Sequence, residues 1–224
     1  MAFDKAPEWL GAIIFAELLA PPGQAQAIPL IVKVLYTAFI AILVPAYCRY
    51  YGPSNFLWFS DLALLITLAA LWLESPFLAG MQAVSVGLLE VAWLVDFLAG
   101  LLCGINLIGL SRYMFKPEIP LAIRGLSLFH VGLPVLLLWL VWRLGYDPRA
   151  WMAQTVLAWA VLLVCYFFIE PSRNINWVFG PGEKPQTRMP AGLYLLVLML
   201  FMPGCVYFPT HLLLQAIFPS GARP

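Results

Sequence analysis

Six long apolar runs constrain this chain more than any other feature of its sequence. Each run comes close to the ~20 mostly apolar residues that a helix needs to cross the hydrocarbon core of a membrane. They occupy residues 29–50, 55–73, 76–98, 119–144, 151–169 and 192–218. Short connections rich in proline, glycine and charge separate them. The pattern predicts an all-α, polytopic bundle of about six spanning helices, which forms a single integral membrane domain over residues 1–224.

The composition supports this prediction. Charged residues make up 10% of the chain and apolar residues 63%, whereas soluble domains carry roughly 25% charged and 45–50% apolar residues. So few charges cannot cover the surface of a soluble domain of this size, so lipid must cover much of it. The formal net charge of +1 gives no field that would recruit nucleic acid. We expect an integral membrane protein, with the bacterial inner (cytoplasmic) membrane as its location.

Two segments lie outside the six runs. Residues 7–20 are apolar but too short to span, contain Glu17 and precede two prolines, so we expect a short interfacial helix. Residues 99–118 are mixed in character and are expected to form a short amphipathic helix. The four cysteines include no C-x-x-C pair and no cluster with histidine. We therefore expect no disulfide framework, no metal site and no cofactor.

The basic residues suggest an orientation. We use "side B" for the face that holds the connections after the first, third and fifth runs, and "side A" for the opposite face. Six lysines and arginines fall on side B and four on side A, which favours side B as cytoplasmic. Those on side B are Arg49, Arg112, Lys116, Arg173, Lys184 and Arg188, and those on side A are Lys5, Arg143, Arg149 and Arg223.

Polar residues inside spanning helices are costly, and each is a functional candidate. Most of those in this chain fall in the half of the bilayer that adjoins side B, although they come from different runs. At 1.5 Å per residue, Ser60 would lie roughly 8 Å and His130 roughly 16 Å below the start of their helices. The group comprises Ser60, Asp61, Asp96, Arg124, Ser127, His130, Asn174, Asn176 and Trp177, with Glu90 deeper. Such convergence predicts a polar pocket in one leaflet, whereas His211 belongs to the opposite interface.

Each of these residues also has a structural interpretation. Serine and threonine in membrane helices often bond to their own backbone or to a neighbouring helix, and His130 can serve the same purpose. Asp96 and Arg124 are predicted to form an ion pair between the third and fourth spans, because an unpaired charge in the membrane is costly. The loop around Asn174 and Asn176 is either a capping turn anchored by Trp177 or a lid over the pocket.

Three short segments resemble the YwaF-like family of integral membrane proteins. Leu57–Ala63 reads Leu-Trp-Phe-Ser-Asp-Leu-Ala and is similar to the Leu-His-Leu-Cys-Asp-Leu segment that opens a helix in that family. Phe129-His130, followed by Pro134, resembles its membrane-embedded histidine. Asn174–Phe179 resembles its Asn-Tyr-Met-Phe/Leu loop, which ends in proline. The resemblance covers the second to the sixth span.

The resemblance implies a chemistry. Members of the mammalian branch transfer acyl groups to ether phospholipids with a cysteine and a histidine, and more distant relatives hydrolyse fatty-acid esters of hydroxy fatty acids with a threonine and a histidine. By position, the nucleophile falls on Ser60, which stands where the acyltransferases have cysteine, and the base falls on His130.

The leading hypothesis is therefore a lipid acyl-ester hydrolase or acyltransferase. Asp61 or Asp96 would orient His130. Asn174, Asn176 or Arg124 would stabilise the oxyanion, and Trp177 and Glu90 would contact the substrate. The alternatives are a non-catalytic accessory or scaffold subunit bound to partner membrane subunits, and a transporter of small solutes or protons that uses Glu90 and Asp96 as a relay.

Overall fold

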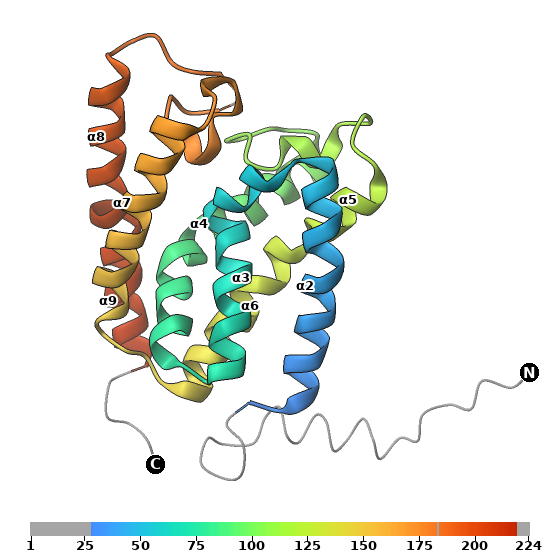
Figure 1. Cartoon of the computed structure of the whole chain (residues 1–224), viewed down its shortest axis with the longest axis vertical. Coiled ribbons are helices and arrows are strands. Elements are labelled where there is room, and N and C mark those ends of the chain that lie inside the picture. Colours follow the sequence, from blue (N-terminus) through green and yellow to red (C-terminus); the bar gives the residue numbers. More distant parts are fainter. Residues whose placement is uncertain (1–27, 183, 219–224) are drawn as a thin grey trace, which may run out of the picture.

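The computed structural model describes residues 28–182 and 184–218, and in these ranges every regular element is a helix. The chain runs back and forth along one axis, so consecutive long segments are antiparallel (Figure 1). The expected interfacial helix at residues 7–20 lies outside the described residues. The α-helices are α2 (Leu30–Tyr50), α3 (Phe59–Leu73), α4 (Pro76–Cys103), α5 (Leu121–Leu126), α6 (Phe129–Leu144), α7 (Ala150–Phe168), α8 (Ala191–Phe201) and α9 (Phe208–Ile217).

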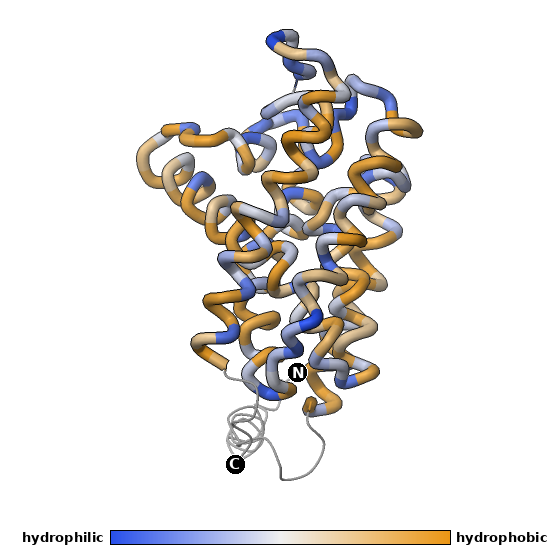
Figure 2. Tube along the Cα trace, turned by 90° about the vertical axis from the view of Figure 1, so that its left-hand side faces the viewer, coloured by the Kyte–Doolittle hydropathy of each residue, from blue (hydrophilic) through white to orange (hydrophobic). Residues whose placement is uncertain are grey.

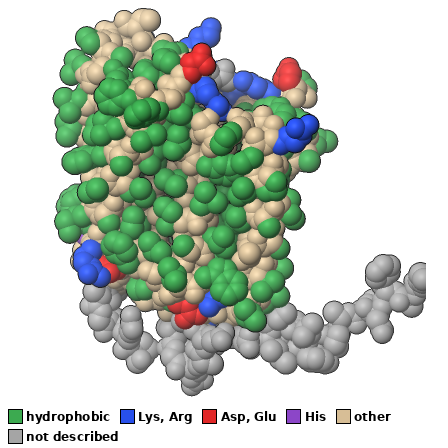
Figure 3. Space-filling view, viewed as in Figure 1, with side chains coloured by type: hydrophobic (Ala, Val, Ile, Leu, Met, Phe, Trp, Pro, Cys, Tyr) green, Lys and Arg blue, Asp and Glu red, His purple; other side chains and the backbone are tan. Residues whose placement is uncertain are grey.

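The long axis of this bundle is built to cross a membrane. Among the described residues, five segments are long and apolar enough to span, and α3 is a shorter apolar helix of 15 residues. Apolar side chains cover the sides of the molecule, while charged side chains gather at its two ends (Figure 3). The trace shows the same division, with hydrophobic residues along the bundle and many hydrophilic ones in the end loops (Figure 2). The prediction of an all-α integral membrane protein is confirmed.

Three of the predicted spans are interrupted. The run at 55–73 divides into a 3-10 turn, Pro53–Leu57, and α3. The run at 119–144 breaks at Ser127–Leu128 into α5 and α6. The run at 192–218 contains a π-helix at Met202–Tyr207, which includes Pro203 and Gly204. Proline removes a helical donor and π-turns widen the helix, so both cause local departures from α geometry.

Helix α4 is the centre of the bundle and packs against α3, α6, α7 and α9. It is longer than predicted, because it continues past residue 98 to Cys103 and ends where Gly104 adopts a φ of +69°. Glycine reaches this left-handed conformation without the steric cost that other residues bear. Residues 99–118 therefore do not form the separate amphipathic helix that was expected. They contain the end of α4, a loop and the 3-10 turn Arg112–Phe115.

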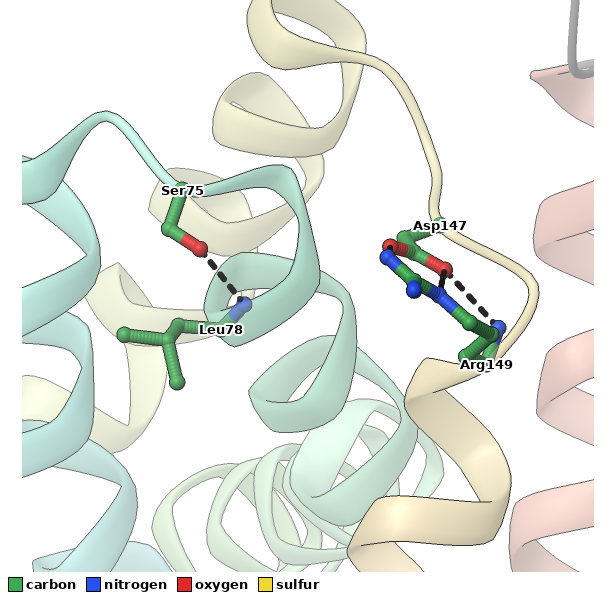
Figure 4. Close-up of polar contacts among 4 residues, drawn as sticks. All are labelled: Ser75, Leu78, Asp147 and Arg149. Atoms are coloured by element: carbon green, nitrogen blue, oxygen red, sulfur yellow. Dashed lines mark hydrogen bonds and ion pairs between the residues drawn. The ribbon is translucent and has the colours of Figure 1, made fainter.

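The two side A connections shown in Figure 4, before α4 and before α7, are short and contain local polar contacts. The Ser75 hydroxyl accepts a hydrogen bond from the Leu78 N–H at 3.3 Å and caps the start of α4. In the turn before α7, an Arg149 Nη2 atom lies 2.8 Å from Asp147 Oδ2. Lys33 was not singled out in the sequence, and its Nζ lies 2.7 Å from Glu74 Oε1. These polar groups of side A therefore contact one another, and the longer loops of the described chain lie on side B.

Candidate functional site

A cavity of about 480 Å³ opens at the side B end of the bundle. Its walls come from the end of α2, the starts of α3 and α6, the middle of α4 and the three side B connections. Many of the lining side chains are aromatic or carry hydroxyl groups. The lining residues are Tyr47, Tyr51, Asn55, Trp58, Ser60, Asp61, Trp93, Gly109, Leu110, Tyr113, Lys116, Ser127, Phe129, His130, Ser172, Arg173, Asn174, Ile175, Trp177 and Gly182.

His130 is the most constrained side chain of this cavity. It is the second residue of α6, and its Nδ1 lies 2.6 Å from Oε2 of Glu90 on α4. Its ring stacks between Trp93, at 4.5 Å between centroids, and Phe129, at 4.1 Å. Glu90 is 2% exposed, and its second oxygen, Oε1, has no hydrogen-bond partner. Glu90 is thus a hydrogen-bond partner of His130. The sequence had suggested instead that Glu90 contacts the substrate.

Ser60 and Asp61 lie in the first turn of α3 and both line the cavity. Ser60 is half-buried, whereas Asp61 is 5% exposed. The Asp61 Oδ1 atom has no hydrogen-bond partner among the described residues. No hydrogen bond joins Ser60 to His130 in the described part of the chain. Both residues line the same cavity, so a substrate bound there has access to both.

Asn176 is a structural residue. Its Oδ1 accepts a hydrogen bond from the Phe59 N–H at 3.0 Å, and its Nδ2 donates to the Leu57 carbonyl at 2.7 Å. A second, longer contact of 3.8 Å joins Nδ2 to the Cys165 sulfur. Asn176 therefore ties the loop to the first turn of α3, and it does not line the cavity. The prediction that it stabilises an oxyanion is wrong, because both hydrogens of its amide are used.

Asn174 is also engaged, although it lines the cavity. Its Nδ2 donates to the carbonyls of Gly180 and Gly182, each at 2.8 Å, and its Oδ1 accepts from the Phe179 N–H at 2.9 Å. Its φ of +38° lies in the left-handed region, which asparagine tolerates better than most residues. Asn174 shapes the loop, and its amide has no hydrogen left for an oxyanion. Trp177 follows in the same loop and lines the cavity.

The predicted ion pair between Asp96 and Arg124 is absent, although both residues lie in the described range. Asp96 is fully buried and accepts four hydrogen bonds, from the N–H groups of Ile108, Gly109 and Ser111 and from the Ser111 hydroxyl, at 2.8 to 3.1 Å. Arg124 Nη1 donates to the Met114 carbonyl at 2.9 Å. Neither residue lines the cavity. Asp96 closes the loop after α4, so it neither orients His130 nor forms a relay.

Several tyrosines of the site were missed by the sequence analysis. The Tyr47 hydroxyl lies 2.6 Å from Ser127 Oγ. Burial raises the pKa of Tyr51 to about 12 and the pKa of Tyr113 further, so both phenols remain protonated at neutral pH. The sequence feature that could have indicated these tyrosines is the concentration of aromatic residues near the side B ends of the apolar runs. At that position aromatic belts are common in membrane proteins, so these residues did not stand out.

Two cations lie among the lining residues, Lys116 and Arg173. Arg173 Nη2 donates to the Tyr51 carbonyl at 2.6 Å, which ties the long side B loop to the end of α2. No group of three or more His, Cys, Asp or Glu side chains that could hold a metal ion occurs among the described residues. The site therefore offers a histidine with a carboxylate partner, a serine, a second carboxylate and several phenols.

His211 lies at the opposite end of the molecule, near side A. Its Nδ1 lies 2.8 Å from the Tyr146 hydroxyl, and its ring packs beside Trp151 and Phe208. His211 is buried and is not part of the cavity. Comparison of the chain with family models, curated proteins and solved structures found no match.

Proposed function

We propose that this protein hydrolyses or transfers the acyl group of a membrane lipid ester, with Ser60 as the nucleophile. The observation that carries the proposal is the arrangement of His130. Its ring is held by Glu90 on one side and by two aromatic rings on its faces, and it opens onto the same cavity as Ser60. A base that is oriented by an acid and shares a cavity with a hydroxyl is the arrangement that activates serine.

Glu90 would take the orienting role that the sequence assigned to Asp61 or Asp96. With Glu90 ionised, Nδ1 of His130 carries the hydrogen of the 2.6 Å contact, and Nε2 is left as the acceptor. Ser60 Oγ would attack the acyl carbonyl while its proton moves to Nε2. The tetrahedral intermediate would then expel the alcohol, which takes that proton. Water, or an acceptor hydroxyl, would release the acyl group from Ser60 by the reverse sequence of transfers.

The oxyanion of that intermediate needs donors other than those first predicted. The amides of Asn174 and Asn176 are committed to the backbone, and Arg124 lies away from the cavity. The phenols of Tyr51 and Tyr113 line the cavity and stay protonated, so we assign this role to them. Donors of this kind typically contribute about 3–4 kcal/mol to catalysis.

The membrane setting supports a lipid substrate. The side B cavity begins at the ends of apolar helices, where ester groups of lipids lie. The resemblance of Leu57–Ala63 and Phe129-His130 to the YwaF-like family points to the same nucleophile and base. A bacterial inner membrane, with side B facing the cytoplasm, is the location that fits the distribution of basic residues.

Labelling with a fluorophosphonate tests this proposal, because such probes react with activated serines. The protein purified in detergent should be labelled, and peptide mapping should place the label on Ser60. The substitutions H130Q and E90Q should each lower the labelling rate. Ser127 lines the same cavity but bonds to Tyr47, so S127A is the matched control and should be labelled normally. Label on another serine, or no label, would contradict the proposal.

A non-catalytic role as an accessory subunit is the second candidate. It is favoured by the finding that Asp96, Asn174 and Asn176 all serve to fix loops. Such a protein would be isolated together with partner membrane subunits, and S60A would leave that association unchanged. The relay proposed for a transporter loses its support, because Asp96 is enclosed by backbone donors.

A further inference from the structure

Asp61 is a buried carboxyl group that the proposed reaction does not use. It is 5% exposed and lines the cavity, and no lysine or arginine forms an ion pair with it in the described ranges. Its Oδ1 atom also has no hydrogen-bond partner there. Buried charges are normally paired because the loss of hydration is costly. A buried carboxyl group without a partner either takes up a proton or is paired by a ligand, and the place of Asp61 on a cavity wall points to a ligand that supplies the opposite charge.

The walls around Asp61 favour one kind of cation. Three tryptophans and three tyrosines line the cavity, namely Trp58, Trp93, Trp177, Tyr47, Tyr51 and Tyr113. Trp93 is stacked against His130 and Phe97, so the candidate cage comes from the other five rings. The faces of aromatic rings attract organic cations, and aromatic cages recognise ammonium groups in this way. A metal ion would instead require several oxygen, nitrogen or sulfur ligands. Among the described residues, no such cluster of acidic, histidine or cysteine side chains is present.

We propose that the side B cavity binds the ammonium group of an organic cation, with Asp61 as its counter-charge and the aromatic side chains as its walls. The volume of about 480 Å³ accommodates such a group together with part of a larger molecule. Lys116 and Arg173 also line the cavity, and they suit an anionic part of the same molecule, such as a phosphate. The inference concerns binding alone and holds whether or not Ser60 is a nucleophile. Combined with the proposed function, it narrows the substrate to an ester that carries an ammonium group.

Calorimetric titration of the full-length protein in detergent with choline chloride tests the inference. Potassium chloride at the same ionic strength serves as the reference. Wild-type protein should bind choline, and D61N should bind it at least about tenfold more weakly, which corresponds to about 1.4 kcal/mol. E118Q is the matched control, because Glu118 is an exposed carboxylate outside this cavity, and it should bind like the wild type.

A second substitution protects the test against misfolding of D61N. Trp177 lies in the side B loop and lines the cavity, so W177L removes a wall without touching a buried charge. It should weaken choline binding by several-fold. Fluorophosphonate labelling of Ser60 is measured separately from choline binding, so failure of the hydrolase proposal and failure of this inference give different results. Equal binding by wild type, D61N and W177L, or an equal response to potassium chloride, would overturn the inference.

Discussion

The two histidines of this protein lie at opposite ends of the bundle and occupy contrasting environments. His130 contacts a carboxylate, stacks between two aromatic rings and opens onto a cavity. His211 contacts a tyrosine hydroxyl, packs beside aromatic rings and does not line the side B cavity. His211 is buried and His130 is partly buried, and each lies toward one end of the bundle, so burial and depth distinguish them poorly.

The difference lies in what remains unsatisfied near each ring. Around His211 the polar partner is a neutral hydroxyl. Around His130, Asp61 Oδ1 and Glu90 Oε1 both lack partners, although buried polar groups in native proteins are nearly always paired. Buried atoms without partners also occur at Gln82, Gln154 and Tyr207, but unlike those residues Asp61 lines the side B cavity. Asp61 therefore marks side B as the end where a ligand would complete the structure.

The largest expected effect is the loss of activity on changing His130. The substitution H130Q removes the base and should reduce ester turnover by about 10²- to 10⁴-fold. The matched change H211Q should leave turnover near the wild-type rate, and should lower the free energy of unfolding by about 1–3 kcal/mol because it disturbs the buried contact with the Tyr146 hydroxyl. Turnover and thermal unfolding of both variants check the contrast. A greater loss of activity in H211Q would reverse the assignment of the two ends.

Asp96 is expected to have the largest effect on stability. The substitution D96A leaves four donors without their acceptor, so we expect a loss of about 2–4 kcal/mol. The variant R124Q should cost less, because Arg124 makes one hydrogen bond to a carbonyl. A double-mutant cycle measured by unfolding in detergent should give a coupling energy near zero. Strong coupling between the two positions would restore the ion pair that the sequence suggested.

Asn176 should have a smaller effect, because it acts as a cap. The change N176A removes the acceptor of the Phe59 N–H and the donor to the Leu57 carbonyl, and should cost about 1–2 kcal/mol. Asn106 is exposed on the loop after α4, so N106A is a suitable control with little expected change. Thermal unfolding compares the two. If N176A were as stable as N106A, the loop would not be tied to α3 through this side chain.

The smallest effect belongs to the exposed pair on side A. Arg149 lowers the pKa of Asp147, chiefly through their side-chain hydrogen bond. The contribution of the pair to the free energy of unfolding is therefore present above the ordinary Asp pKa of about 4. It is lost as the pH falls through the lowered pKa of Asp147. Because Arg149 is 77% exposed, R149Q should not shift the unfolding temperature measurably at neutral pH. A clear shift would show that the turn before α7 depends on this pair.

The lengths of the apolar runs were sufficient to predict the architecture, because lipid fixes how many apolar residues a span needs. Depth along each run also placed Ser60, Asp61 and His130 in the same half of the bundle. The breaks were not predictable in the same way. The run at 119–144 contains glycine, serine and proline throughout, and nothing in its sequence shows that the helix stops at Ser127–Leu128.

The partners of the polar residues were harder to predict than their depth. A sequence shows how far along a helix Asp96 lies, but its rotation decides whether it meets Arg124 or the loop that follows. In the structure, the backbone N–H groups of Ile108, Gly109 and Ser111 donate hydrogen bonds to Asp96 instead. The pairing of Glu90 with His130 was missed for a related reason, because Glu90 was placed deeper in the membrane. Whether the two side chains meet depends on how α4 and α6 face each other.

The central claim is that Ser60 is an activated nucleophile in the side B cavity. The most direct measurement is the rate at which the protein, reconstituted in lipid nanodiscs, hydrolyses a fluorogenic acyl ester before and after S60A. We expect S60A to abolish turnover while its unfolding temperature stays near that of the wild type. S127A changes another serine of the same cavity and should retain most of the activity. Full activity in S60A, or an equal loss in S127A, would contradict the assignment of Ser60.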